Sequence, residues 1–140
     1  MIMTDDLFRK AAAHADGFRD ADPLLLHEHL RKVHVVDVRE PGEFGGELGH
    51  IEGAHLVPLA TVPAEARTWD PDAPIALVCR SGARSGNAAR QLVQMGFKKV
   101  VNLRGGMIAW NAAARPIVRT PAMPNDALRP AAPAQARGAS

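Results

Sequence analysis

The stretch Ile75–Ser85 (IALVCRSGARS) decides the fold, because an apolar strand runs directly into a short polar loop. Good helix formers follow from Asn87 to Met95, and Gly96 is placed to end that helix. Apolar strands that alternate with helices are typical of a mostly parallel sheet between two helical layers. We therefore expect an α/β fold in which Cys79 lies at the carboxyl end of a buried strand, facing the first turn of a helix.

Cys79 has surroundings that make a thiol reactive. Unpaired N–H groups at the helix start lie at the positive end of the helix dipole, and Arg80 and Arg84 add full positive charge. These features favour the thiolate, so the pKa of Cys79 should fall below the free value of about 8.5. The alternative, an inert core cysteine, is disfavoured by the polar and small residues that follow it.

The small residues of the loop let the backbone curl tightly, so that its N–H groups converge on one point. We therefore predict a cradle for an anion, with a nucleophile at its floor. The predicted catalytic residue is Cys79. The predicted substrate-binding residues are Arg80, Ser81, Gly82, Ala83, Arg84 and Ser85.

Four stretches of the chain resemble the rhodanese (sulfurtransferase) family. They are the CRSGARS loop with its Ala-rich helix, VVDVREPGEF at 35–44, GHIEGAHLVPL at 49–59 and VVNLRGGMIAW at 100–110. They occur in the family's order, which is more specific than a loop match alone. The resemblance implies a doubly wound, mostly parallel sheet with helices on both faces, and the Cys79 loop at the carboxyl edge of a central strand.

The resemblance also implies a two-step, ping-pong sulfur transfer. The thiolate of Cys79 would take the outer sulfur of a small-molecule donor such as thiosulfate and form a persulfide. A thiol or cyanide would then accept that sulfur. Arg80 beside the nucleophile favours thiosulfate, because family members that prefer mercaptopyruvate tend to have a less basic loop.

Two alternatives stay open at this point. One is a persulfide carrier that delivers sulfur to a specific protein partner. The other, less favoured, is a cysteine-dependent phosphatase. Such phosphatases place an arginine six positions after the cysteine, whereas Arg84 is at the fifth position after Cys79. A smaller ring suits a terminal sulfur atom better than a phosphoryl group.

Three residues at strand ends are candidates for a supporting role around the site: Asp37, Arg39 and Arg104. We interpret the first two mainly as a charged pair that pins loops. His50 is interpreted as fixing a turn, since a thiolate held by N–H groups and arginines needs no base. His27 and His29 point in different directions on a helix and would not share a metal.

The chain is expected to have three segments. Residues 1–21 should be an N-terminal helical extension, with a helix over Asp5–Ala13 that Thr4 caps. Residues 22–118 should form the rhodanese-like domain. Residues 119–140 are rich in Pro, Ala and Arg, so we expect a disordered tail unless a partner orders it.

Within residues 22–118 we expect helices over 23–30, 61–67, 87–95 and 107–114, and strands over 33–38, 56–59, 75–78 and 98–103. The expected buried side chains of the three main helices are Leu25, Leu26 and Leu30, then Ala88, Leu92 and Met95, then Met107, Trp110 and Ala114.

Composition excludes several classes of function. The chain of 140 residues is long enough for one domain, and its single cysteine permits neither an intrachain disulfide nor a cysteine-based zinc site. A net charge of +2 and the absence of tyrosine argue against nucleic-acid binding. The charged N-terminus and the lack of a long apolar run predict no membrane segment and a cytoplasmic location. No metal or other cofactor is expected.

Overall fold

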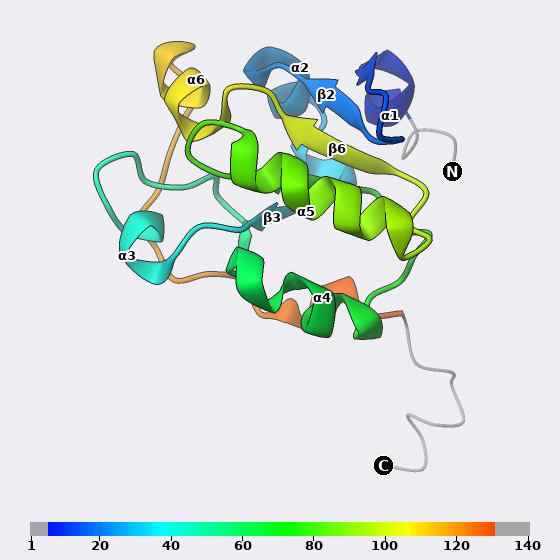
Figure 1. Cartoon of the computed structure of the whole chain (residues 1–140). Coiled ribbons are helices and arrows are strands. Elements are labelled where there is room, and N and C mark those ends of the chain that lie inside the picture. Colours follow the sequence, from blue (N-terminus) through cyan, green and yellow to red (C-terminus); the bar gives the residue numbers. More distant parts are fainter. Residues whose placement is uncertain (1–5, 131–140) are drawn as a thin grey trace.

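The computed structural model describes residues 6–130, which form one mostly parallel sheet with helices on both faces (Figure 1). The strand order is β1-β2-β6-β5-β3-β4. Within these residues only the β1–β2 pair is antiparallel. The strands are β1 Ala12–Ala13, β2 Arg19–Ala21, β3 His34–Asp37, β4 His55–Leu56, β5 Ile75–Val78 and β6 Val100–Leu103. The expected doubly wound α/β fold is confirmed.

The helices form two layers, with α4 and α5 on one side of the sheet and α1, α2 and α6 on the other (Figure 1). The α-helices are α1 Asp6–Lys10, α2 Pro23–Glu28, α3 Pro41–Phe44, α4 Val62–Glu65, α5 Ala83–Gln94 and α6 Gly106–Ala112. Short 3-10 turns lie at Leu30–Lys32, Leu59–Thr61, Ala66–Thr68 and Asn125–Leu128.

The central strand β5 divides its side chains between two cores. Ile75 and Leu77 join the core that contains Leu92 of α5, whereas Ala76 and Val78 join the core on the other face. All four side chains of the strand are fully buried. Because successive side chains point to opposite faces and both faces are covered, the strand is a continuous apolar run.

Helix α5 begins four residues earlier than the predicted start at Asn87, at Ala83. Gly82 precedes it with a φ of 105°, in the left-handed region that glycine adopts at low cost. Arg84 and Ser85 therefore lie in the first helical turn rather than in a loop, and Ser85 is fully buried. The predicted order of strand, loop and helix is confirmed, but the loop is shorter than expected.

The helix predicted over Asp5–Ala13 is also shorter. Helix α1 ends at Lys10, and β1 and β2 then form a hairpin that turns at Gly17, where φ is 95°. Strand β2 pairs in parallel with β6, which places residues 19–21 inside the sheet rather than in a helical extension. The predicted cap, Thr4, lies outside the described residues.

Several predicted core positions are not fully buried. Leu26 is buried, whereas Leu25 and Leu30 are only half-buried, and Leu30 lies beyond the end of α2 at Glu28. Met95 is 38% exposed at the end of α5. Ala114 is exposed beyond the end of α6, so it no longer shares that helix's buried face.

Residues 119–130 differ from the expected disordered tail. After α6 the chain runs down one edge of the molecule and reaches the side on which α4 lies (Figure 1). Leu128 is fully buried in the core on the α5 side of the sheet, and its carbonyl accepts a hydrogen bond of 2.9 Å from the Asp70 N–H. One leucine is too weak a pattern to be recognised in a polar segment. Residues 131–140 lie outside the described residues.

Leu128→Ala should lower the free energy of unfolding by about 2–5 kcal/mol, because it leaves a cavity in the core. Urea denaturation followed by tryptophan fluorescence measures this change. The control is Met123→Ala in the same segment, whose side chain is 48% exposed. It should change stability by less than about 0.5 kcal/mol. Small and equal effects of both substitutions would contradict the packing of this segment.

Candidate active site

The Cys79 sulfur lies at the carboxyl end of β5 and is enclosed by the start of α5. The residue is 1% exposed. Its Sγ accepts a hydrogen bond of 3.0 Å from the Gly82 N–H, and the Ser85 Oγ lies 3.3 Å from it. Because these groups come from the shortened loop and the first turn of α5, the sequence-predicted cradle is present around the sulfur.

Helix α6 closes the loop from the other side. The Met107 N–H donates to the Cys79 carbonyl at 2.8 Å, and the Ile108 N–H donates to the Arg80 carbonyl at 3.0 Å. A Cβ at Gly106 would overlap the Cys79 carbonyl oxygen, so a larger residue would push the helix away. The N-terminal N–H groups of α6 thus satisfy the carbonyls of the loop and hold its shape.

Hydrogen bonds set the ionisation of Cys79. Burial raises the pKa of the Cys79 thiol, but hydrogen bonds from Ser85, Gly82 and Ser81 outweigh burial, so the pKa lies below its ordinary value. This direction agrees with the prediction, but the prediction attributed the lowered pKa partly to the charges of Arg80 and Arg84. The groups in direct contact with the sulfur are instead a serine hydroxyl and backbone N–H groups.

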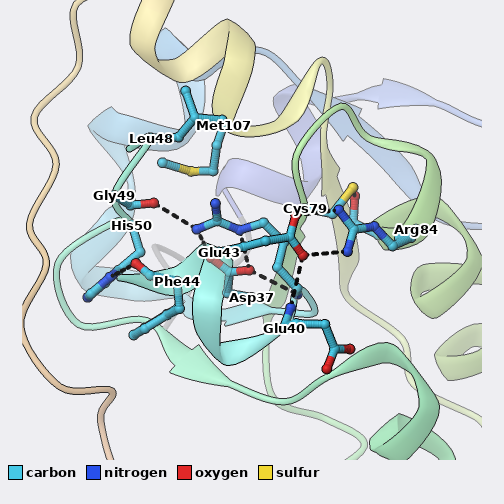
Figure 2. A network of polar contacts seen from close by, with 12 residues as sticks. Asp37, Glu40, Glu43, Phe44, Leu48, Gly49, His50, Cys79, Arg84 and Met107 are labelled. Carbon is cyan, nitrogen blue, oxygen red and sulfur yellow. Dashed lines mark hydrogen bonds and ion pairs between the residues drawn. The ribbon is translucent and has the colours of Figure 1, made fainter. Parts of the chain in front are cut away.

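Arg84 forms a two-bond ion pair with Glu43 of α3. Its two terminal nitrogens donate to the two carboxylate oxygens, each at 2.8 Å (Figure 2). This hydrogen bonding lowers the pKa of Glu43 to about 2. The Glu43 side chain also accepts from the Glu40 N–H in a capping box. Arg84 therefore ties α3 to the Cys79 loop, and its charge is balanced within the protein.

Asp37 and Arg39 form a second ion pair, and the side chain of each residue is 1% exposed. Two guanidinium nitrogens donate to the carboxylate at 2.9 and 2.8 Å, and one also donates to the Gly49 carbonyl at 2.7 Å (Figure 2). His50 is buried, with Nδ1 2.8 Å from the Phe44 carbonyl and its ring stacked on that residue. These contacts pin loops, as we interpreted them from the sequence.

Asn102 of β6 is a site residue that the sequence did not identify. Its Oδ1 accepts a hydrogen bond of 2.5 Å from the Ser85 hydroxyl, and its Nδ2 donates to Asp20 Oδ1 at 3.1 Å. A polar residue in the apolar strand VVNL was the available signal. Alternation along the strand directs Asn102 to the α5 side of the sheet, where Val100 also points.

An open cleft lies beside the loop. The cleft is lined by Arg39, Glu43, Glu47, Leu48 and Arg80. Arg80, Ser81 and Ala83 are exposed on the loop and the first turn of α5, and Arg104 is exposed directly after β6. Arg80 is therefore the predicted donor ligand that both lines the cleft and presents an exposed side chain.

Residues 6–130 contain no group of three or more His, Cys, Asp or Glu side chains that could hold a metal ion. His27 and His29 contact different partners, since one ring lies 3.1 Å from an Arg115 nitrogen and the other 2.9 Å from the Leu25 carbonyl. None of the helices in this part of the chain is long and apolar enough to cross a bilayer.

Comparison with known sequences identifies relatives over most of the chain. The YqhL protein of Bacillus subtilis is 41% identical over 80 residues, which are 57% of this chain and 62% of that protein. The chain thus spans less than two thirds of YqhL. A protein of Allochromatium vinosum named sulfurtransferase is 41% identical over 86 residues, which are 61% of this chain and 78% of that protein.

The fold and a family model agree with these relatives. A rhodanese-related protein from Thermoplasma volcanium has a TM-score of 0.68 at 28% identity, covering 74% of this chain and 100% of its own. The model of the rhodanese-like domain matches residues 21–113, which include the Cys79 loop, both ion pairs and Asn102. The chain therefore belongs to the rhodanese-like domain family, which includes sulfurtransferases.

Proposed function

We propose that this protein is a sulfurtransferase that moves sulfane sulfur from thiosulfate to a thiol or cyanide through a persulfide on Cys79. The observation that carries the proposal is the environment of the sulfur. Sγ is the only thiol sulfur of the chain, and N–H and O–H donors surround it at the carboxyl edge of the sheet. Such donors stabilise an anionic sulfur before and after transfer.

In the first step the Cys79 thiolate attacks the outer sulfur of thiosulfate. A sulfur–sulfur bond forms to Sγ, and the bond between the two sulfur atoms of the donor breaks. Sulfite leaves with the bonding electron pair, and the enzyme holds a persulfide anion. The N–H groups of Ser81 and Gly82, which favour the thiolate, would stabilise that anion as well.

In the second step the acceptor takes the outer sulfur. A thiolate or cyanide attacks it, the bond to Sγ breaks, and Sγ leaves as the thiolate that began the cycle. Because one product departs before the second substrate reacts, the scheme is ping-pong. The chain has no other cysteine, so the acceptor must come from outside it.

Thiosulfate is the donor that the charges favour. The ion pairs of Arg84 and Arg39 are internally neutral, whereas Arg80, next to the nucleophile, adds an exposed positive charge to the cleft, which Glu47 also lines. A dianionic donor gains most from such a cation. A relative from Shewanella oneidensis, 36% identical over 90 residues, is named thiosulfate sulfurtransferase, which supports the same choice.

Mixing the reduced protein with thiosulfate should add the mass of one sulfur atom, and cyanide should remove it. Intact-protein mass spectrometry measures both half-reactions. Cys79→Ser is the control and should gain nothing, because the nucleophile is absent. Adduct formation by Cys79→Ser would contradict the mechanism. Failure of the wild-type protein with thiosulfate, together with loading by a protein persulfide, would favour the carrier alternative.

The two loop arginines should differ in their effect on thiosulfate use. Arg80→Ala should lower kcat/KM for thiosulfate about three- to tenfold, the range for a partly exposed charge contact. Arg84→Ala should have a smaller effect, because its guanidinium is bound to Glu43. Steady-state kinetics with cyanide measures both, and Arg90→Ala, on the outer face of α5, is the control.

Glu43→Gln extends the same test. It leaves the shape of the side chain but removes the negative charge that balances Arg84. The released cation should raise kcat/KM for thiosulfate above that of the wild-type protein. An equal loss in Arg80→Ala and Arg84→Ala, with no gain in Glu43→Gln, would show that Arg84 binds the donor despite its ion pair.

Persulfide formation should depend on pH through the thiolate. The lowered pKa of Cys79 means that the reactive anion is present above that pKa and is lost as the pH falls through it. The rate of the first half-reaction should therefore rise with pH, with a midpoint below the ordinary value of a cysteine thiol. Stopped-flow mixing with thiosulfate across a pH series measures it. A midpoint at or above the ordinary value would contradict the hydrogen-bonded thiolate.

A further inference from the structure

The Ser85 hydroxyl has two acceptors and one proton. Its Oγ lies 2.5 Å from Asn102 Oδ1 and 3.3 Å from Cys79 Sγ. At any moment the hydroxyl donates to the amide oxygen or to the sulfur, but not to both.

The orientation of the Asn102 amide follows from its other neighbours. Its Nδ2 lies 3.1 Å from the Asp20 carboxylate and 3.4 Å from the Gly82 carbonyl, and both of these groups accept hydrogen bonds. Only the NH₂ end of the amide can face them. The amide oxygen is consequently directed at Ser85, where it attracts the hydroxyl proton and turns an oxygen lone pair toward the sulfur.

We propose that Asn102, oriented by Asp20, is a positioning residue that competes with Cys79 for the Ser85 hydroxyl proton and so limits how readily the thiol ionises. The proposal rests on the proposed function only in taking Cys79 as the nucleophile. Asn102 acts on the ionisation of Cys79 through Ser85, so its effect requires the Ser85 hydroxyl.

Because of this competition, the Ser85 hydroxyl donates to different acceptors at different stages of the catalytic cycle. When Cys79 is a thiol, Ser85 donates to Asn102 and accepts from the S–H group. When Cys79 is a thiolate, the hydroxyl turns to the sulfur, and the buried amide oxygen loses its donor. In the persulfide the negative charge lies on the outer sulfur, so the Ser85 proton returns to Asn102.

Other charged groups around the loop also act on the Cys79 thiolate, and one of them, Asp20, loses a hydrogen bond when Asn102 is replaced. They come from the loop itself, from α5 and α3, and from the ends of β2, β3 and β6. These groups are Arg80, Arg84, Glu43, Asp20, Asp37, Arg39 and Arg104. The part of the change in the titration of Cys79 that disappears in the Ser85→Ala background therefore reports on the Ser85 hydroxyl.

The test is a titration of thiolate ultraviolet absorbance against pH. The chain contains no tyrosine, so tyrosinate does not contribute, and Cys79→Ser supplies the blank. Asn102→Leu should lower the pKa of Cys79 by about one unit, which is about tenfold in thiolate fraction below the pKa. Ser85→Ala should raise that pKa, because the thiolate loses a donor. The double variant should titrate like Ser85→Ala.

A merely structural role for Asn102 predicts a different result. Replacing a polar side chain by an apolar one disfavours a nearby charge, so the pKa of Cys79 would rise. A rise, no change, or a shift that persists in the Ser85→Ala background would each overturn the proposal. Asn102→Ala is a second variant in case the leucine does not fit, and Asn87→Ala, exposed on α5, is the control. The titration requires no sulfur donor, so its outcome is separate from that of the thiosulfate assays.

Discussion

The sulfur of Cys79 is almost completely enclosed by protein, so any negative charge on it must be balanced by protein groups rather than by water. That constraint explains the local architecture. The sulfur lies at the carboxyl edge of a parallel sheet, where the first turn of α5 supplies N–H groups that have no helical partner. Helix α6 binds the carbonyls of the same loop, which keeps its N–H groups directed at the sulfur.

Four charged residues near the site form two ion pairs, and in each pair the two charges cancel. The Asp37–Arg39 pair is buried and holds the end of β3 to the turn at Gly49. The Glu43–Arg84 pair joins α3 to α5 across the opening of the loop. Removing one partner of the buried pair would leave an uncompensated charge, so these residues fix geometry. Outside these two pairs, the charged side chains that line the cleft are Arg80 and Glu47.

Local pattern predicted the parts of this structure whose determinants are close in sequence. The apolar run before Cys79 identified β5, the small residues after it identified the cradle, and the paired glycines at the start of α6 identified the last helix. The missed contacts join residues that are far apart in the chain. Glu43 and Arg84 are separated by 41 positions, and Asn102 and Asp20 by 82. Neither residue of such a pair is recognisable from the sequence, because the two meet only when the sheet has formed.

Asn102 is a polar residue in an otherwise apolar strand, and the three-dimensional structure explains its presence there. The other residues of β6 are apolar and buried, and an amide among them is costly unless its hydrogen bonds are made. Ser85, Asp20 and Gly82 supply those partners. A strand selected for stability alone would place an aliphatic side chain at this position, which faces α5. The cost of the buried amide is explained by its contact with the hydroxyl that also reaches the sulfur, so the polar exception in β6 belongs to the site.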